Sequence, residues 1–239
     1  MTSASEIQTM FGRVASRYDF LNHVLSGGVD YWWRHVLAKL VKTQKPRRLL
    51  DLATGSGDVL LALQTADAAE SYVGADFCLP MLQVAQKKGL SQLTVADGLQ
   101  LPFMNDSFHA ITISFGFRNW IDRSAGLQEM IRVLSPGGYV YILEFSQPWK
   151  WVCPSYYFYL RHFLPKLAQL FGANARDYIY LGDSIRAFPQ PDLLGQMMAD
   201  AGFSEVQWNR LTAGLVALHW GRKPGDLEPP LRHPERKVR

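Results

Sequence analysis

A glycine-rich turn between acidic residues is the segment of this sequence whose residue types are best suited to bind a ligand. An apolar run ends in the sequence TGSGD at 54–58, and an apolar helical pattern follows. Glycines at the end of a strand let a ligand approach the backbone closely, because no Cβ stands in the way. We therefore expect Gly55, Ser56 and Gly57 to contact a cofactor.

The residues around this turn indicate the charge of the ligand. A dinucleotide fingerprint needs a third glycine, but Leu60 stands there, and Asp51 and Asp58 would repel a pyrophosphate. The same carboxylates favour a ligand with cationic sulfonium and ammonium groups, such as S-adenosylmethionine. A nicotinamide-dependent oxidoreductase is disfavoured on these grounds, while a relative of the fold that binds no nucleotide stays open.

Two further acids end the next two predicted strands. Asp76 precedes Phe77, and Asp97 precedes Gly98. Because the carboxyl ends of parallel strands meet at one edge of a sheet, we expect Asp76 to accept the ribose hydroxyls of a nucleoside and Asp97 to reach the adenine amino group. We include Phe77 and Gly98 in the predicted cofactor site. Capping of a turn is the alternative for Asp51 and Asp97.

The elements that would position these residues alternate along the chain. Short β-branched or apolar runs alternate with helical patterns, which is typical of a mostly parallel α/β sheet. We predict parallel strands at 47–53, 71–76, 93–97, 109–116 and 139–146, and helices that begin near Asp58, Pro80, Ser124 and Pro191. The runs at 204–212 and 214–223 are too close for a helical crossover, so they must pair antiparallel. The predicted fold is a Rossmann-like sheet of seven strands with a C-terminal hairpin.

The predicted domain organisation is one domain at 1–223 with two additions. A helical N-terminal extension at 1–42 is broken at 26–28, and an aromatic helical insertion occupies 149–188. Residues 224–239 are rich in proline and charge. We expect them to be disordered, because they lack the apolar content that offsets the entropy of ordering.

Composition narrows the classes of function. The 239 residues are 48% hydrophobic, which suits a full core, and no apolar run approaches the ~18 residues of a membrane-spanning helix. Six basic and three acidic residues at 222–239 supply +3 of the net charge of +4, so we expect no nucleic-acid partner. Cys78 and Cys153 lack the CxxC spacing of a metal site, so we expect no metal. Because no long apolar run is present, we expect a cytoplasmic protein.

Four segments of the sequence carry a resemblance to a known family. They are YDFLNHVLSGGVDYWWR at 18–34, ITISFGFRNW at 111–120, RVLSPGGYVYILEFSQP at 132–148 and YIYLGDSIRAFPQPDLLGQMMADAGF at 178–203. Over 11–223 the chain resembles the ubiquinone/menaquinone biosynthesis C-methyltransferases, which belong to the class I methyltransferases that use S-adenosylmethionine. Two positions depart from the family pattern: Asp30 replaces a usual His, and Asp97-Gly98 replaces a usual Asn-Ala.

The resemblance implies a class I methyltransferase sheet, a cofactor and an acceptor. The implied cofactor contacts are Ser56, Asp76, Asp97 and Ser114. The implied reaction is C-methylation of a polyprenylated demethylmenaquinol, of the 2-polyprenyl-6-methoxy-1,4-benzoquinol of ubiquinone synthesis, or of both. Alternatives are another small-molecule methyltransferase and a non-catalytic scaffold in the quinone pathway.

The residues after the fourth predicted strand argue against other methyl acceptors. An exocyclic amino group would call for an Asn/Asp-Pro-Pro-Tyr-like loop, and the chain has Phe-Gly-Phe-Arg at 115–118. A pyrimidine carbon would call for a cysteine nucleophile. Cys153 lies in the predicted insertion, where a buried packing thiol is the simpler interpretation.

Three residues are candidates for the catalytic step. Arg118 follows the fourth strand, where its charge would lower the pKa of an acceptor phenol, and Asn119 and Tyr18 would complete a donor set. A salt bridge from Arg118 to Asp19 or Asp122 is one alternative, and packing roles for Asn119 and Tyr18 are another. No general base is evident; the resemblance suggests a water near Arg118, and His162 and His219 are alternatives.

The aromatic residues indicate how the protein would bind a lipid substrate. The cluster at 149–163, with Tyr31, Trp32 and Trp33, is suited to line a slot for a prenyl tail or to contact a membrane surface. Core packing explains some of the same residues. The expected partner is a polyprenylated quinol, with peripheral contact at the inner face of the membrane and a homodimer left open.

Overall fold

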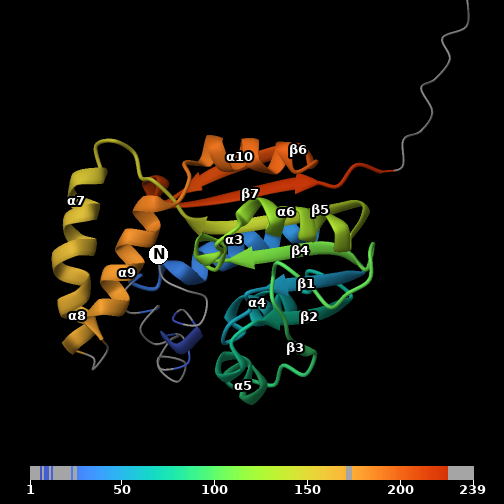
Figure 1. Cartoon of the computed structure of the whole chain (residues 1–239), viewed down its shortest axis with the longest axis horizontal. Helices are drawn as coiled ribbons and strands as arrows, with labels where there is room; N and C mark the ends of the chain where they lie inside the picture. The colour runs from blue at the N-terminus through green and yellow to red at the C-terminus, as the bar shows by residue number, and fades with distance from the viewer. Residues whose placement is uncertain are drawn as a thin grey trace, which may run out of the picture.

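Seven strands form one mixed sheet in the order β3-β2-β1-β4-β5-β7-β6 (Figure 1). The structure is a computed structural model that describes residues 6, 8–10, 12, 23, 26–170 and 174–225. Strands β1 to β5 are parallel, and β7 pairs antiparallel with both β5 and β6, so the predicted fold class is confirmed. The strands are β1 (Arg48–Leu52), β2 (Ser71–Asp76), β3 (Leu93–Val95), β4 (Phe108–Ser114), β5 (Leu134–Phe145), β6 (Ser204–Leu211) and β7 (Val216–Arg222).

Six of the seven strands differ from their predicted bounds by at least one residue, and three of these differences have a local description. β3 is shorter because Asp97 lies in a turn, where it forms an isolated bridge with Gln100. β5 begins at Leu134, five residues before the predicted start at 139. The last strand begins two residues after 214, because the 3-10 turn η3 (Thr212–Gly214) occupies the corner between β6 and β7.

Helices cover both faces of the sheet, because successive residues of a strand point to opposite sides. Leu50 of β1 belongs to the core cluster that includes Leu194 of α10, whereas Leu49 belongs to a second cluster with Leu37 of α3 and Leu60 of α4. The helices that flank the sheet are α3 (Val29–Thr43), α4 (Asp58–Thr65), α5 (Leu79–Lys87), α6 (Arg123–Val133) and α10 (Pro191–Asp200).

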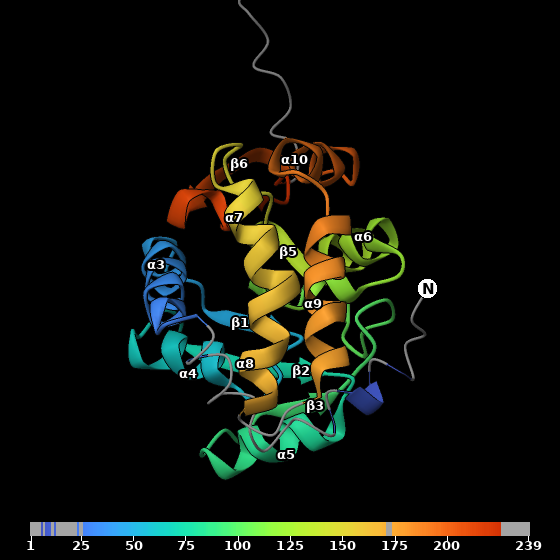
Figure 2. The same ribbon diagram turned by 90° about the vertical axis from the view of Figure 1, so that its left-hand side faces the viewer.

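A further group of helices lies in front of the carboxyl ends of the parallel strands (Figures 1 and 2). As the sequence predicts, the segment between β5 and α10 is helical. It contains α7 (Cys153–Phe158), the π-helical turn η2 (Tyr159–Phe163), α8 (Leu164–Leu170) and α9 (Ala175–Ala187). Leu160, Leu164, Tyr178 and Ile185 form a separate small core between these helices.

The termini of the chain are described only in part. α3 begins directly after Gly28, whose positive φ of 78° agrees with the break predicted at 26–28. Tyr18 and Asp19, and the predicted tail from 226 onward, lie outside the described residues. Within the described ranges, no helix is long and apolar enough to cross a lipid bilayer.

Candidate active site

Asp51 is buried at the carboxyl end of β1, in the middle of the sheet. Its two carboxylate oxygens accept hydrogen bonds of 2.6 Å from the hydroxyls of Thr54 and Thr112. Burial raises the pKa of Asp51 from 3.8 to about 6, and the two hydroxyl donors oppose that rise. A carboxylate that is costly to ionise in the ligand-free protein would regain stability beside a cation.

The turn after β1 is held against the end of β2. The backbone N–H of Gly55 donates to Oδ2 of Asp76, and the N–H of Cys78 donates to Oδ1, both at 2.8 Å. Burial raises the pKa of Asp76, and these N–H donors oppose the rise. A Cβ added to Gly57 would lie 2.3 Å from Cδ1 of Leu90, so close packing between α4 and the chain after α5 requires a glycine there.

A cavity of about 390 Å³ opens at this edge of the sheet, a size typical of small-molecule sites. Its lining contains eight of the nine residues predicted to contact a cofactor; they are Asp51, Gly55, Ser56, Asp76, Phe77, Asp97, Gly98 and Ser114. Gly57 is the exception, because it faces the core instead. We call this cavity the cofactor cavity.

The donor set of the cofactor cavity fits S-adenosylmethionine better than a pyrophosphate-bearing nucleotide. The lining includes the carboxylates of Asp51, Asp76 and Asp97, which suit a sulfonium, an ammonium and ribose hydroxyls. The buried hydroxyl of Ser114 has no hydrogen-bond partner among the described residues, so it is available to a ligand. Asp97 also accepts from the N–H of Leu99 at 2.9 Å, so it caps its turn while lining the cavity.

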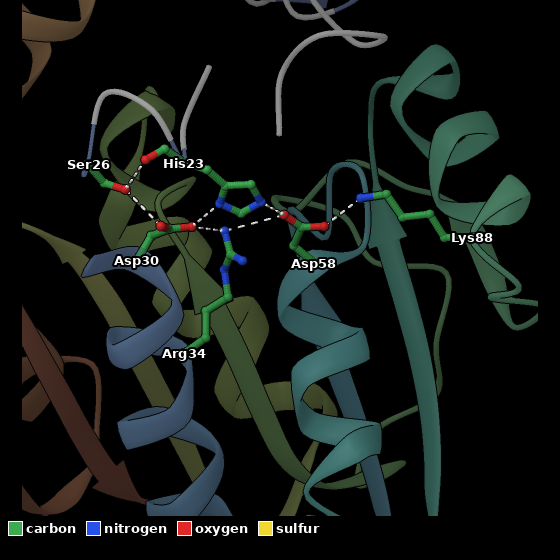
Figure 3. A network of polar contacts seen from close by, with 6 residues as sticks. All are labelled: His23, Ser26, Asp30, Arg34, Asp58 and Lys88. Atoms are coloured by element: carbon green, nitrogen blue, oxygen red, sulfur yellow. Dashed lines mark hydrogen bonds and ion pairs between the residues drawn. The ribbon is translucent and has the colours of Figure 1, made fainter. Parts of the chain in front are cut away.

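Asp58 plays a different role from the one that the sequence indicates. Its carboxylate forms ion pairs with Lys88 and, at 3.3 Å, with Nη2 of Arg34 (Figure 3). These cations offset the negative charge that we expected Asp58 to present to a ligand. Lys88 comes from the end of α5, thirty residues along the chain, and no local pattern relates it to Asp58.

Asp30, which departs from the family pattern, is buried in the same network (Figure 3). Its carboxylate lies 2.6 Å from Nδ1 of His23, accepts from the hydroxyl of Ser26 at 2.7 Å and forms a 2.6 Å ion pair with Nη2 of Arg34. The family resemblance would place a histidine at position 30, and this chain has Asp30 there instead. His23 brings an imidazole into direct contact with that position from the preceding turn.

A second cavity of about 320 Å³ adjoins the cofactor cavity, and Arg34 and Phe115 line both. Most of its lining is apolar or aromatic and comes from α3, η2, α8 and α9. We call it the acceptor cavity. Tyr156 and Tyr159 line it, whereas the side chain of Trp151 is 73% exposed, so the aromatic segment is divided between an inner and an outer face.

Arg118 lines the acceptor cavity and forms a buried ion pair that the sequence did not indicate. Its Nη1 lies 2.9 Å from Oε1 of Glu144, and its backbone N–H donates to the same carboxylate. The predicted alternative of a salt bridge to Asp122 is wrong, because the Asp122 side chain accepts from the N–H of Ala125 and caps α6. The only sequence signal for Glu144 is an acid inside an otherwise apolar strand.

Of the remaining predicted site residues, Asn119 lies at a cavity, whereas His162 and His219 do not. Asn119 lines the cofactor cavity and accepts a 3.0 Å hydrogen bond from the hydroxyl of Tyr180, a residue that the sequence analysis missed. His162 and His219 line neither cavity, so the structure does not support them as bases. Nε2 of His219 donates to the backbone carbonyl of Pro191, its one hydrogen-bond partner among the described residues, and burial lowers the pKa of His219 to about 4.

Comparison with known proteins places this arrangement in a family. A sequence model of the ubiE/COQ5 methyltransferase family matches residues 1–223. The chain is 45% identical to a demethylmenaquinone methyltransferase of Thermus thermophilus, over 90% of this chain and 100% of the relative. It is 42% identical to a ubiquinone/menaquinone biosynthesis C-methyltransferase of Geotalea daltonii, over 91% of this chain and 96% of the relative.

Solved structures show the same fold at low sequence identity. A methyltransferase of Thermotoga maritima superposes with a TM-score of 0.67 and 17% identity, over 90% of this chain and 98% of that one. A phosphoethanolamine methyltransferase of Haemonchus contortus in complex with S-adenosylmethionine gives a TM-score of 0.54 and 15% identity, over 74% and 49% of the two chains. The sheet order, the acid-lined cavity and the match across residues 1–223 agree, and the chain belongs to the ubiE/COQ5 methyltransferase family.

Proposed function

We propose that the protein transfers a methyl group from S-adenosylmethionine to a ring carbon of a polyprenylated quinol. The acceptor is a demethylmenaquinol, the 2-polyprenyl-6-methoxy-1,4-benzoquinol of ubiquinone synthesis, or both. Membership of the family and the names of its relatives support this function. The structural observation that carries it is a pair of adjoining cavities, one lined by acids and one by apolar side chains, with Arg34 and Phe115 in both linings.

The cofactor would be held along the carboxyl ends of successive strands. Asp97 beyond β3 would accept from the adenine amino group, Asp76 at the end of β2 would accept from the ribose hydroxyls, and Asp51 at the end of β1 would offset the charge of the cationic groups. The hydroxyls of Ser56 and Ser114 complete the contacts. When bound, S-adenosylmethionine supplies an electrophilic methyl group next to the acceptor cavity.

The acceptor must be reduced for carbon to act as the nucleophile. A ring carbon becomes nucleophilic when a phenolate pushes electron density to the ortho position, so a quinol reacts and the oxidised quinone does not. Arg118 stabilises that phenolate: its Nε is buried and has no hydrogen-bond partner among the described residues, while Nη1 is held by Glu144. Alignment of the two bound partners supplies much of the remaining rate gain.

Asn119 is the second polar group that would reach the ring, from the cofactor cavity that it lines. Its Oδ1 accepts from the Tyr180 hydroxyl, which fixes the amide and leaves its NH₂ to donate to a ring oxygen. Tyr18, predicted as a third donor, lies outside the described residues.

The exposed face of the helical insertion supports a peripheral membrane contact. The side chains of Trp149, Trp151, Phe158 and Phe163 are 46–73% exposed. Residues 149–170 contain Lys150, Arg161 and Lys166 and no acidic residue. Aromatic side chains beside basic ones suit the surface of an anionic bilayer. The other side of the same helices lines the acceptor cavity, so a quinol would have a short path from the bilayer to the site.

The test of this function is transfer of label from radiolabelled S-adenosylmethionine into lipid. Purified protein is incubated with reduced demethylmenaquinol, with its oxidised form, or with the benzoquinol, alongside the variant Arg118→Ala. Label is expected in the reduced acceptor only, and the variant is expected to be slowed by roughly 100-fold or more. Absence of label with every quinol would overturn the function, and a wild-type rate in the variant would remove Arg118 from the mechanism.

A further inference from the structure

Arg34 is the one cationic side chain among the described residues that line the cofactor cavity. The same lining contains four carboxylates, those of Asp51, Asp58, Asp76 and Asp97. Arg34 comes from α3, outside the sheet, and its side chain is 10% exposed. A guanidinium in a lining whose other charged side chains are all acidic therefore needs an explanation.

The chemistry of the cofactor supplies one. The methionine part of S-adenosylmethionine carries an ammonium and a carboxylate, and acids alone would repel the carboxylate. We propose that Arg34 binds the carboxylate of the methionine moiety of the cofactor. The inference depends on the cofactor and not on the identity of the methyl acceptor.

The contacts of Arg34 leave part of its guanidinium group available to a ligand. Nη2 forms the 2.6 Å ion pair with Asp30 and lies 3.3 Å from Asp58 (Figure 3). No hydrogen bond to Nε or Nη1 is found among the described residues. A planar guanidinium fixed by one nitrogen can present the others to a carboxylate in a defined direction. Asp30, itself held by His23 and Ser26, thus acts as a positioning residue for Arg34.

The place of Arg34 agrees with this role. α3 packs against α4, which follows the glycine-rich turn of β1, whereas Asp97 follows β3 at the other side of β2. A cofactor with its adenine at Asp97 would therefore extend its methionine toward Arg34. Because Arg34 also lines the acceptor cavity, a carboxylate held there would set the direction of the sulfonium methyl toward the acceptor.

Two other arrangements compete with this one. In the first, the backbone of the glycine-rich turn binds the carboxylate, although the N–H groups of Gly55 and Gly57 already donate to Asp76 and Thr54. In the second, Arg34 is purely structural and only links α3 to α4. Decarboxylated S-adenosylmethionine separates them, since it keeps the sulfonium and the ammonium and lacks only the carboxylate.

The experiment measures binding of both ligands by calorimetry to the wild-type protein and to Arg34→Met. S-adenosylmethionine is expected to bind roughly 10- to 100-fold more weakly to the variant, while the affinity of the decarboxylated ligand changes by less than about threefold. The wild-type protein is expected to prefer the carboxylated ligand by a similar factor. Equal losses for both ligands, or no loss for either, would overturn the assignment of Arg34.

Lys88→Met is the matched control. It removes the lysine that is paired with Asp58 but changes no residue of the cavity lining, so it is expected to affect both ligands alike. Should Arg34→Met fail to fold, Arg34→Gln takes its place in the same comparison of the two ligands. Equal affinity of the wild-type protein for both ligands would also overturn the inference, because it would rule out a specific carboxylate contact. Failure of the wild-type protein to bind S-adenosylmethionine at all would overturn the cofactor assignment and this inference with it.

Discussion

Nη1 of Arg118 lies 2.9 Å from the carboxylate of Glu144, and both side chains are buried at the end of the sheet nearest the acceptor cavity. Glu144 lines neither cavity, so it cannot serve as the base of the reaction in this geometry. Its role is to fix the guanidinium. The pair also lowers the net charge that the acceptor meets, which lets Arg118 be buried without a bound anion.

Loss of Glu144 is expected to destabilise the fold. Removing one partner of a buried pair leaves an uncompensated charge, so Glu144→Gln should lower the free energy of unfolding by about 3 kcal/mol in urea denaturation. The control Glu205→Gln breaks the exposed pair with Arg222 and should cost less than about 1 kcal/mol. If Glu144→Gln and Arg118→Met were additive in the double variant, the two side chains would not be coupled.

Cofactor affinity is expected to rise with pH through the titration of Asp51. Burial raises the pKa of Asp51 from 3.8 to about 6, so below that value the folded protein holds a neutral carboxyl that cannot attract a cation. Affinity should fall by about tenfold per pH unit below 6. In the ligand-free protein the sign is opposite, because a raised carboxyl pKa contributes stability that is lost as pH rises from 3.8 to about 6.

Calorimetry with S-adenosylhomocysteine between pH 5 and 7 checks the dependence on Asp51. The variant Asp51→Asn should bind more weakly and show a flatter profile. Burial also raises the pKa of Asp76, so the slope that remains in the variant would report that carboxyl. An unchanged slope in Asp51→Asn would show that Asp51 does not control the affinity.

Gly57→Ala is expected to destabilise the protein through a steric clash as well as backbone strain. Gly57 has a φ of 85°, and an added Cβ would meet Leu90 at 2.3 Å. Gly89→Ala is the matched control, because Gly89 has a φ of 94° but no atom within 4 Å of an added Cβ. Strain alone costs about 1–2 kcal/mol, and overpacking adds about 1–3 kcal/mol at Gly57 only. Equal shifts in thermal unfolding would argue against the clash.

Tyr180→Phe is expected to slow methyl transfer without weakening cofactor binding. The change removes the 3.0 Å hydrogen bond that holds the Asn119 amide, and a bond of this kind contributes roughly 0.5–1.5 kcal/mol, or about 2- to 12-fold in rate. Initial rates with a saturating quinol and calorimetry with S-adenosylhomocysteine measure the two effects. Tyr157→Phe, which removes a hydroxyl bonded to Gln147 outside both cavities, is the control. Equal rates for both variants would leave Asn119 without support from Tyr180.

The sequence by itself determined the sheet and the cofactor edge. Alternating strand and helix patterns identify parallel strands, and parallel strands place their carboxyl ends at one edge. Asp51, Asp76 and Asp97 could therefore be assigned to one cavity from their positions along the chain. The glycine-rich turn was predictable for the same reason, because positive φ angles at Gly55 and Gly57 are local properties of the backbone.

Only the tertiary structure decided which charges are free and which are paired. Glu144 meets Arg118 across 26 residues and Lys88 meets Asp58 across 30, distances over which no periodicity operates. The same holds for the aromatic insertion, where Tyr156 faces a cavity and Trp151 faces outward. Spacing along a chain encodes the local geometry of helices and strands, whereas the partner of a buried charge depends on how separate elements pack, and that packing is set by the whole core at once.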